Sequence, residues 1–395
     1  MKNKFLTLLL LPLLLVTSCN KQEEPEEKPF EVDKQFVYGM TDIGWQEYEW
    51  SHISFTEQHK LYDALGVKSV RFWTHATWVL KDPYTVNEAG YKTARDSFNE
   101  IKDKGYLIIG LSHGSFKRMY LGQDNSSKGS AKPPRDLKEG SNYLKWLQEY
   151  EDSWYTLVGL FPEIEYWEID NETNNTDFMS RVGGGQFSKY EMAQITYDMM
   201  YFASRGIHRA NPNAKTVMGG LVMKGLEDFL ENLYDLIING DQWDSTNPDD
   251  YFQVACWHPY MEGFNKKRFI NLNNSVYEVV KRREGKDKKV FLTEAGFNDT
   301  NYNLNEEKIG QYVKDMYQAA KDDLYYVESL CYYRMWDLDS GRYGLFTNPT
   351  KLREGENAPN KAAPKPAAYA YQEVAGGSGD LQSFEKYILE NGTCS

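Results

Sequence analysis

Cysteine is scarce in this 395-residue chain, and its four cysteines lie far apart. Cys256 and Cys331 fall in strand-like runs, where buried free thiols are expected, and Cys394 lies beside the C-terminus. No C-x-x-C pair or Cys/His spacing of the metal-binding kind is present. The sequence therefore predicts no metal site.

Clusters of basic residues are also missing. The formal net charge is -13 and no Lys/Arg stripe is present, so nucleic acid and anionic membrane surfaces are poor partners for this chain. Aromatic residues are abundant instead, with 10 Trp and 29 Tyr. Aromatic rings with polar rims suit the apolar faces of sugar rings, although part of this excess must serve ordinary packing.

A long apolar run, Phe5 to Val16, stands near the start of the chain after Lys2 and Lys4. This arrangement predicts a signal peptide over residues 1–19, too short and wrongly flanked for a spanning helix. The following V-T-S-C string resembles a bacterial lipobox, which implies lipidation of Cys19. The alternative is a plain signal peptide with a coincidental cysteine.

Residues 20–34 are acidic and poor in aromatics, which predicts a flexible tether. This stretch resembles the acidic signal that follows the lipidated cysteine of surface-exposed lipoproteins. We therefore expect an exported protein at the outer membrane or cell surface, with membrane contact only through the Cys19 lipid. The rest, residues 35–395, is long enough for one large domain or two small ones.

From residue 35 onward, short apolar or β-branched runs alternate with longer segments of helical periodicity. The predicted strands are Phe36–Met40, Lys68–Trp73, Leu107–Ser112, Ile164–Ile169, Thr216–Leu221, Phe252–Trp257, Lys289–Thr293 and Ser329–Met335. The predicted helices are Ser54–Leu65, Glu88–Lys104, Leu144–Leu157, Lys189–Ala210, Leu226–Ile238, Asn274–Arg283, Glu306–Leu324 and Lys365–Val374. Eight strands, each followed by a helix, predict a single-domain α/β fold, the (β/α)8 TIM barrel. A doubly wound sheet is the alternative, but the Gly-rich first turn that it often has is absent.

The lengths of the connections agree with a barrel enzyme. Helix-to-strand connections are short, whereas several strand-to-helix connections are long and rich in Gly, Asn, Ser and Tyr. The long ones are His113–Gly140, Asn171–Ser188, His258–Asn273 and Asp337–Pro364. Active sites of (β/α)8 barrels lie on the strand-to-helix side.

Two glutamates stand where predicted strands end. Glu172 follows the fourth strand in E-Y-W-E-I-D-N-E, and Glu294 ends the seventh in K-V-F-L-T-E-A. In a closed eight-stranded barrel, strands four and seven lie across the cavity from each other, so the two carboxylates can converge on one bound bond. Retaining glycosidases use two carboxyl groups roughly 5–5.5 Å apart, one as acid/base and one as nucleophile.

These motifs resemble those of clan A glycoside hydrolases, and Y-W-E-I-D-N-E is especially similar to the strand-four motif of families 39 and 51. C-W-H-P-Y resembles the H-x-Y pattern on strand six, Arg71 resembles the clan's strand-two arginine, and Trp336 its aromatic platform. The resemblance spans residues 36–374 and specifies no single family. Asp170 stands where family 51 usually has Gly, and Thr173 where families 5 and 39 commonly have Pro.

The resemblance implies a role for each residue. Glu172 is expected to be the acid/base and Glu294 the nucleophile, kept ionised by Arg71 and by a hydroxyl such as that of Tyr260. Because two nearby carboxylates do not both ionise easily, Glu172 is expected to keep its proton. Asn171 would bind the sugar 2-hydroxyl and Trp336 would lie beneath the sugar. The other substrate-binding candidates are His258, Tyr260, Trp73 and His113, with His75, Trp45 and Trp257 less distinct.

Each candidate also has a structural interpretation. Arg71 could form an ion pair with a buried acid. His258 and Tyr260 could be residues of the barrel mouth whose hydrogen bonds are all made within the protein. Aromatic residues at strand ends often pack in the core. Glu168 and Asp170 share the alternation of Glu172 and could be buried hydrogen-bonded acids.

The expected function is retaining hydrolysis of a β-linked polysaccharide or oligosaccharide, without a cofactor and by a monomer. Surface anchoring favours endo over exo cleavage slightly, because polymers are cut before import, and the question stays open. The main alternative is a non-catalytic surface carbohydrate-binding lipoprotein on a barrel scaffold. A metal-dependent hydrolase or an aldolase lacks support, since no H-x-H or Lys stands at the relevant strand ends.

Overall fold

The structure is a computed structural model that describes residues 36–43, 55–112, 130–298, 300, 305–337, 341–347 and 363–381. The predicted leader with Cys19, the acidic tether, Trp45 and His113 lie outside the described residues. What the sequence indicates for them stays a prediction.

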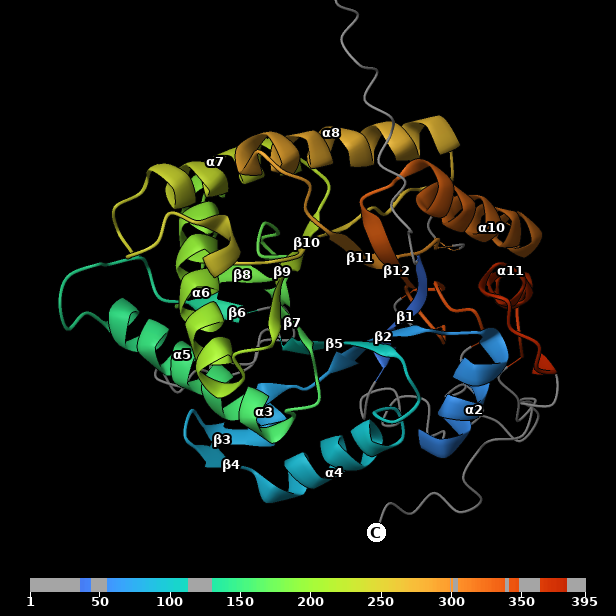
Figure 1. The fold of residues 1–395 in the computed structure, drawn as a ribbon, viewed down its shortest axis with the longest axis horizontal. Helices are drawn as coiled ribbons and strands as arrows, with labels where there is room; N and C mark the ends of the chain where they lie inside the picture. The colour runs from blue at the N-terminus through green and yellow to red at the C-terminus, as the bar shows by residue number, and fades with distance from the viewer. Residues whose placement is uncertain are drawn as a thin grey trace, which may run out of the picture. The chain divides into compact units, whose positions relative to one another are not determined.

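Eight parallel strands close into a barrel in the order β1-β12-β11-β10-β9-β7-β5-β2 (Figure 1). They are β1 (Val37–Ile43), β2 (Ser69–Trp73), β5 (Leu107–Ser112), β7 (Tyr166–Asn171), β9 (Lys215–Val222), β10 (Ala255–His258), β11 (Val290–Ala295) and β12 (Val327–Tyr332). The pairing is parallel at every junction. The prediction of a (β/α)8 barrel is confirmed.

Helices surround the barrel, as Figure 1 shows. The major ones are α2 (Phe55–Leu65), α4 (Glu88–Asn99), α5 (Asn142–Leu160), α6 (Lys189–Ala210), α7 (Leu226–Asn239), α8 (Lys266–Glu284), α10 (Glu306–Asp323) and α11 (Pro366–Ala375). In the described part of the chain, no helix combines the length and the apolar character needed to cross a membrane.

The main core lies between the strands and the helices. All six residues of β11 are buried, as expected for a parallel strand that is covered on both faces. Trp154 of α5 meets Trp167 of β7 edge to face at a centroid distance of 6.0 Å, and Phe72 of β2 meets Phe98 of α4 at 5.4 Å. Such aromatic pairs fix the helices against the barrel.

The inside of the barrel is polar. The Ser329 hydroxyl donates to the Ser69 hydroxyl at 3.1 Å, and Arg71, Glu168 and Thr293 are fully buried. Buried polar groups of this kind require partners, and these side chains supply them to one another. They form the base on which the strand ends carry the candidate site.

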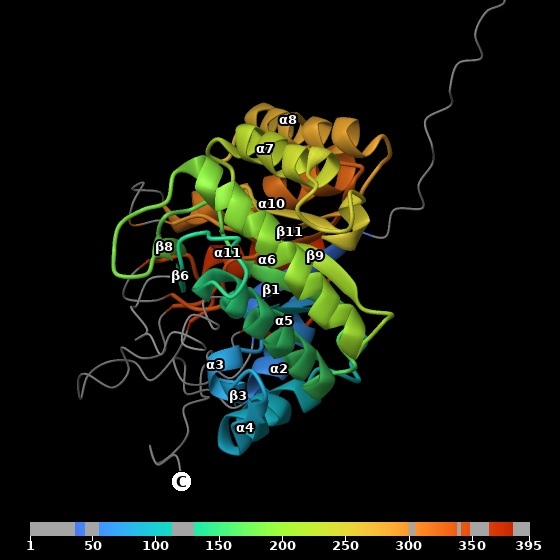
Figure 2. The same ribbon diagram turned by 90° about the vertical axis from the view of Figure 1, so that its left-hand side faces the viewer.

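The strand-to-helix connections contain additional elements that the sequence did not predict. After β2 come the short helix α3 (Ala76–Val79) and the hairpin of β3 (Leu80–Asp82) and β4 (Thr85–Val86). The third and fourth connections contribute β6 (Ser130–Lys132) and β8 (Met179–Arg181), which pair in parallel and lie at the left of Figure 2. A helix-to-strand connection, the one from α7 to β10, contains the short 3-10 helix η2 (Pro248–Asp250).

Several predicted boundaries are wrong. The fourth strand was placed at Ile164–Ile169 but runs over Tyr166–Asn171, and the sixth begins at Ala255 rather than Phe252. Helix α8 begins at Lys266, eight residues before the predicted Asn274. The stretch from Lys266 to Asn273 contains two Asn, a residue of low helix propensity, and the buried Phe269 and Asn273 hold it against the barrel. Trp257 donates to the Asn273 side chain at 2.7 Å.

Asn265 starts α8, because its side-chain oxygen accepts the Arg268 amide at 2.9 Å. We expect Asn265→Ala to lower the free energy of unfolding by about 1 kcal/mol, the usual effect of losing an N-cap. The matched control Asn271→Ala, at an exposed position inside α8, is expected to be neutral or slightly stabilising because Ala favours helices. Urea unfolding of both variants is the measurement. Equal effects at the two positions would contradict a helix that begins at Lys266.

Candidate active site

The site is built from residues at the carboxyl ends of strands that lie apart in the chain. Arg71 comes from β2, Asn171 ends β7 with Glu172 directly after it, His258 ends β10, and Glu294 lies in β11. The closed barrel brings these four strand ends to one mouth.

Arg71 is the centre of the buried network and has no exposed surface. Its guanidinium binds Glu168 through two nitrogens, with Nε to Oε2 at 2.8 Å and Nη2 to Oε1 at 2.6 Å. Nη2 also donates to Asn171 Oδ1 at 2.7 Å. Nη1 donates to Glu294 Oε1 and, at 3.5 Å, to the Thr41 hydroxyl. Burial works against the charged form, but the charges of Glu168 and Glu294 raise the pKa of Arg71 well above its usual value.

Glu168 proves to be a buried structural acid, as one interpretation of the sequence allowed. Besides Arg71, its Oε1 accepts the Gly220 amide at 2.9 Å and the Thr293 hydroxyl at 3.2 Å. Both oxygens of the Glu168 carboxylate therefore accept hydrogen bonds inside the barrel. Glu168 therefore holds Arg71 in place and leaves Nη1 directed at Glu294.

Glu172 sits at a strained turn. Asp170 and Glu172 both have left-handed backbone conformations, with φ of 65° and 46°. Such conformations cost non-glycine residues about 1–3 kcal/mol each, so the surroundings must hold them. The Glu172 amide donates to the Gly220 carbonyl at 2.8 Å, which anchors the turn to β9.

The Glu172 carboxylate has two side-chain partners. Asn175 Nδ2 donates to Oε2 at 2.9 Å, and His258 Nδ1 lies 3.0 Å from Oε1. Glu172 is 8% exposed, so the carboxylate still reaches the surface of the mouth.

The hydrogen bonds of His258 define its tautomer. The Thr293 hydroxyl gives its proton to Glu168, so its oxygen is left to accept from His258 Nε2 at 3.1 Å. With Nε2 carrying a hydrogen, Nδ1 shares a single proton with Glu172. His258 and Glu172 thus form one proton-sharing pair, either charged on both groups or neutral on both.

Two glycines of β9 allow close approach, Gly220 to the His258 imidazole and Gly219 to the backbone that leads into the Glu172 turn. A Cβ on Gly220 would lie 1.9 Å from His258 Nε2, and one on Gly219 would lie 2.3 Å from the Ile169 carbonyl oxygen. The imidazole therefore packs directly on the backbone of β9. Only glycine allows this approach at position 220.

Glu294 is held by a different set of partners. Arg71 Nη1 contacts Oε1, and the Tyr260 hydroxyl donates to Oε2 at 2.8 Å. Glu294 is 8% exposed, and His258 Nδ1 lies 3.7 Å from its Oε2. The contacts expected from the sequence, Arg71 and Tyr260 on Glu294, are present.

The two carboxylates are close together. One oxygen of Glu172, one oxygen of Glu294 and a ring nitrogen of His258 all lie within 4.8 Å of one another. That spacing is near the roughly 5–5.5 Å of retaining glycosidases and short of the roughly 6.5–9.5 Å of inverting ones.

The charge states differ from the sequence-based expectation. Burial raises the pKa of Glu172, but the hydrogen bond and charge of His258 outweigh it, and the pKa lies below the usual value. Burial lowers the pKa of His258, whereas the carboxylates of Glu294 and Glu172 raise it above its usual value overall. Glu172 was expected to hold its own proton, because two carboxylates were considered without the histidine. Both shifts favour an ionised Glu172 and a shared proton on His258 in this resting arrangement.

The remaining predicted residues fall into two groups. Trp73 is partly exposed and stacks on His75 at a centroid distance of 4.6 Å, so this pair lies at the end of β2. Trp336 is only 3% exposed and packs against Phe346, and Trp257 is buried toward α8. The last two occupy core positions in this structure.

Sequence analysis missed several residues of the site. Thr293 and Asn175 orient His258 and Glu172, and Tyr333, which follows β12, meets the Tyr260 ring at 6.0 Å and is partly exposed. Tyr343 meets Tyr260 at 5.8 Å from another connection. The position of Tyr333, one residue past the last strand, could have indicated this residue, but the sequence analysis assigned the aromatic platform to Trp336.

Two groups of side chains have the spacing of metal ligands in the described residues: Glu168, Cys256 and His258, and Glu172, His258 and Glu294. Each group contains a carboxylate that is already paired with the Arg71 guanidinium. A cation bound there would face this permanent positive charge, so the groups fit proton chemistry better than metal binding.

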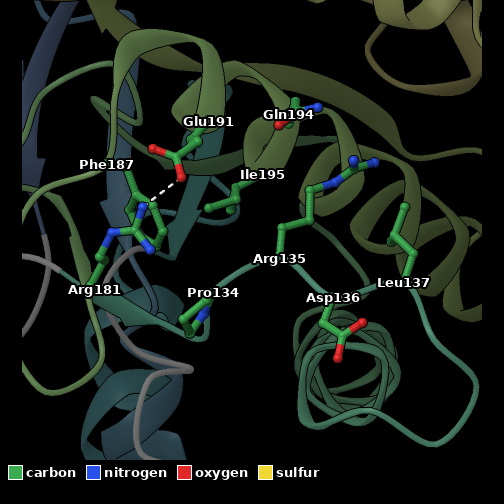
Figure 3. Close-up of a pocket in the computed structure, with 9 residues that line it drawn as sticks. All are labelled: Pro134, Arg135, Asp136, Leu137, Arg181, Phe187, Glu191, Gln194 and Ile195. Carbon is green, nitrogen blue, oxygen red and sulfur yellow. Dashed lines mark hydrogen bonds and ion pairs between the residues drawn. The ribbon is translucent and has the colours of Figure 1, made fainter.

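A separate hollow of about 440 Å³ lies beside α6, between residues 134–137 and the start of the helix (Figure 3). Arg181, Phe187 and Glu191 also line it, and neither Glu172 nor Glu294 does. This hollow is therefore distinct from the carboxylate pair.

A scan against protein-family models and a search of curated proteins each found no match for the sequence. Solved structures are similar in fold. A family 39 glycoside hydrolase from the gut symbiont Bacteroides cellulosilyticus WH2 aligns at TM-score 0.60 and 14% identity, over 87% of this chain and 64% of that chain. This chain thus spans less than two thirds of that protein. A family 1 β-glucosidase from Thermotoga maritima aligns at TM-score 0.56 and 12% identity, over 88% of this chain and 100% of that chain.

These similarities concern the fold, because the identities are low. The structural neighbours are glycoside hydrolases of families 39 and 1, and the closed parallel barrel with surrounding helices is the fold of these glycosidases.

The packing of His258 on Gly220 generates one prediction. We expect Gly220→Ala to displace the imidazole from Glu172 and Thr293 and to lower the free energy of unfolding by roughly 2–3 kcal/mol, as overpacking does. Gly159→Ala is the matched control, since a Cβ there meets nothing within 4 Å inside helix α5 and is expected to be neutral or stabilising. Urea unfolding measures both. A Gly220→Ala variant as stable as the control would contradict the packing described.

The charged His258 generates a second prediction, on pH. Because its folded pKa is raised, the stabilisation is complete below about pH 6.5 and is lost as the pH rises through the raised value. The difference in unfolding free energy between wild type and His258→Gln should therefore be larger at about pH 6 than at about pH 9. Urea unfolding of the two proteins at both pH values is the measurement. A difference that is the same at both values would show that His258 does not gain a charge on folding.

Proposed function

We propose that this protein is a retaining glycoside hydrolase that cleaves a β-linked polysaccharide or oligosaccharide, with Glu294 as nucleophile and Glu172 as acid/base. The observation that carries the proposal is the pair of carboxylates within 4.8 Å at the mouth of a glycosidase-type barrel, each with its own distinct partners. One carboxylate is held by a permanent cation and a hydroxyl, and the other shares a proton with a histidine.

The surroundings of Glu294 suit a nucleophile. Arg71 and the Tyr260 hydroxyl favour its ionised form and fix its orientation. In the first step a Glu294 oxygen attacks the anomeric carbon, and the bond from this carbon to the leaving oxygen breaks. The product of this step is a glycosyl–enzyme ester.

The surroundings of Glu172 suit an acid that later acts as a base. When the proton moves from His258 Nδ1 to Oε1 across the 3.0 Å hydrogen bond, Glu172 can protonate the leaving oxygen. Glu172 then takes a proton from the water that cleaves the ester, and configuration at the anomeric carbon is retained. His258 thus acts as the store of the proton that Glu172 delivers.

Asn171 and the rim aromatics suit sugar binding. Asn171 Oδ1 accepts from Arg71, which leaves its amide hydrogens for a sugar hydroxyl, and the resemblance to clan A implies the 2-hydroxyl. The partly exposed Trp73, which stacks on the buried His75, and the partly exposed Tyr333 supply ring faces near the mouth. We assign the platform beneath the cleaved sugar to Tyr333 rather than to the buried Trp336.

The N-terminal features fit a polymeric substrate. We propose that residues 1–19 direct export and that lipidation of Cys19 places the enzyme at the outer membrane or cell surface. An anchored enzyme meets polymers before they enter the cell, which favours internal cleavage.

We expect Glu294→Ala to lower kcat/KM by about 10⁴-fold or more on every substrate, because no covalent intermediate forms. Glu172→Ala should lower it by about 10²–10⁴-fold on natural glycosides, and by less on aryl glycosides, whose leaving groups need no proton. The assay uses β-linked polysaccharides and aryl glycosides, with product anomers followed by NMR.

Glu262→Ala is the matched control, an exposed glutamate that follows β10 in the connection to α8, and it should retain wild-type activity. Inverted products would contradict the retaining mechanism. Glycan binding without turnover, unchanged in Glu294→Ala, would replace the proposal with a carbohydrate-binding protein.

A further inference from the structure

A buried ion pair outside the catalytic group stands beside the Glu172 turn. Lys132 Nζ lies 3.4 Å from Asp170 Oδ2, and both side chains are almost fully buried. Lys132 belongs to β6 in the third strand-to-helix connection, and Asp170 is the penultimate residue of β7. A buried ammonium is costly unless it is paired, so this lysine depends on Asp170.

Asp170 links that ion pair to the residues of the site. Its other oxygen, Oδ1, accepts the Asn171 backbone amide at 2.8 Å. Asp170 and Glu172 are the two left-handed residues of the turn, with Asn171 between them. The Asp170 carboxylate therefore fixes the peptide that directs Asn171 toward Arg71 and Glu172 toward His258.

β6, the strand that carries Lys132, is held in place by its pairing with β8 and, through β8, by α6. β6 pairs with β8, with Lys132 opposite Arg181. Arg181 forms an ion pair with Glu191 of α6, drawn as a dashed line in Figure 3, and lies 4.5 Å above the Phe187 ring.

The chain after β6 is fixed to the same helix. Arg135 binds the buried Asp198 of α6 with Nε at 2.7 Å and Nη2 at 3.2 Å. The short β6–β8 sheet is thus tied to α6 on one side and to the Glu172 turn on the other.

We propose that Lys132 and Asp170 are a positioning pair, through which the β6–β8 sheet holds the Asn171–Glu172 turn in its reactive conformation. The proposal rests on the proposed function, since it assigns the pair to the chemistry of Glu172. Neither side chain touches the substrate, because both are buried, and the pair acts through the backbone of Asn171 and through its charge.

Within the described residues, the charged and titratable neighbours of the turn can be named. Asp170 faces Lys132 of β6 and Tyr150 of α5, and burial together with the charge of Asp170 raises the pKa of this tyrosine. Glu172 faces His258 from β10, Arg71 from β2 and Glu294 from β11. Removing the Lys132 charge would leave Asp170 uncompensated beside these groups, and a negative charge in a buried site raises the pKa of nearby acids.

The test compares Lys132→Met with the double variant Lys132→Met/Asp170→Asn and with Lys138→Met, an exposed lysine of the same connection, all in the full chain. We expect Lys132→Met to lower kcat by about 10²-fold, as a misplaced catalytic group does, with KM nearly unchanged. The alkaline limb of its pH–rate profile should move to higher pH. The double variant should return the limb to the wild-type position, and Lys138→Met should match wild type.

A folded Lys132→Met with wild-type kcat and an unmoved alkaline limb would overturn the proposal, as would a loss confined to KM. Should Lys132→Met not fold, Asp170→Asn decides the question, because its amide keeps an acceptor for the Asn171 amide but does not pair with Lys132. We expect a kcat loss of about 10-fold at unchanged KM, and wild-type kcat would count against the pair.

If the wild-type chain hydrolyses no glycoside, the proposed function fails and the pair is judged without turnover. NMR titration of the His258 imidazole, identified by its loss in His258→Gln, supplies that readout. A pKa that is higher in Lys132→Met than in wild type supports the coupling of the pair to the site. An unchanged pKa overturns it.

Discussion

The arrangement of the site depends on one buried guanidinium. Arg71 lies inside the barrel, where an unpaired charge would be prohibitive, so its five donors determine what must surround it. Two bind Glu168, which fixes the guanidinium plane, and the others reach Asn171, Glu294 and Thr41. Because these partners come from β1, β7 and β11, the charge of one residue sets the relative positions of strands that are distant in the chain. Replacing this cluster with apolar residues could give a stable barrel, but not one that presents an ionised glutamate at its mouth.

The features that sequence analysis predicted are those that local patterns determine. Period-two and helical periodicity located the eight strands and their helices, and the ends of two predicted strands pointed to Glu172 and Glu294, whose carboxylates the barrel brings together. The start of α8 was placed too late because Asn271, Asn273 and Asn274 have low helix propensity and interrupt the apolar pattern, and the helical state depends on contacts such as Trp257 to Asn273. Local propensity gave no sign of those tertiary contacts.

The parts of the site that were missed depend on pairing between distant segments. Lys132 lies in a three-residue strand that exists through its partner β8, so no run of sequence around it indicates burial beside Asp170. The platform is a similar case. Trp336 is the larger aromatic and was the natural choice, but the chain beyond β12 turns it into the core against Phe346 and leaves Tyr333 beside Tyr260. Residue type alone did not distinguish these two positions, which are separated by three residues.

The charge balance explains why the expected protonation of Glu172 needed revision. Three carboxylates, those of Glu168, Glu172 and Glu294, lie near the guanidinium of Arg71, which pairs directly with Glu168 and Glu294. Glu172 therefore lacks a permanent positive partner, and His258 supplies one by taking up a proton. In the proposed mechanism, a sugar bound between the carboxylates would displace water from the pair and disfavour separated charges, which moves the proton from Nδ1 to Glu172. The proposed role of the histidine is thus to let Glu172 be ionised in the resting site and acidic when the substrate is bound, a change that two isolated carboxylates would not provide.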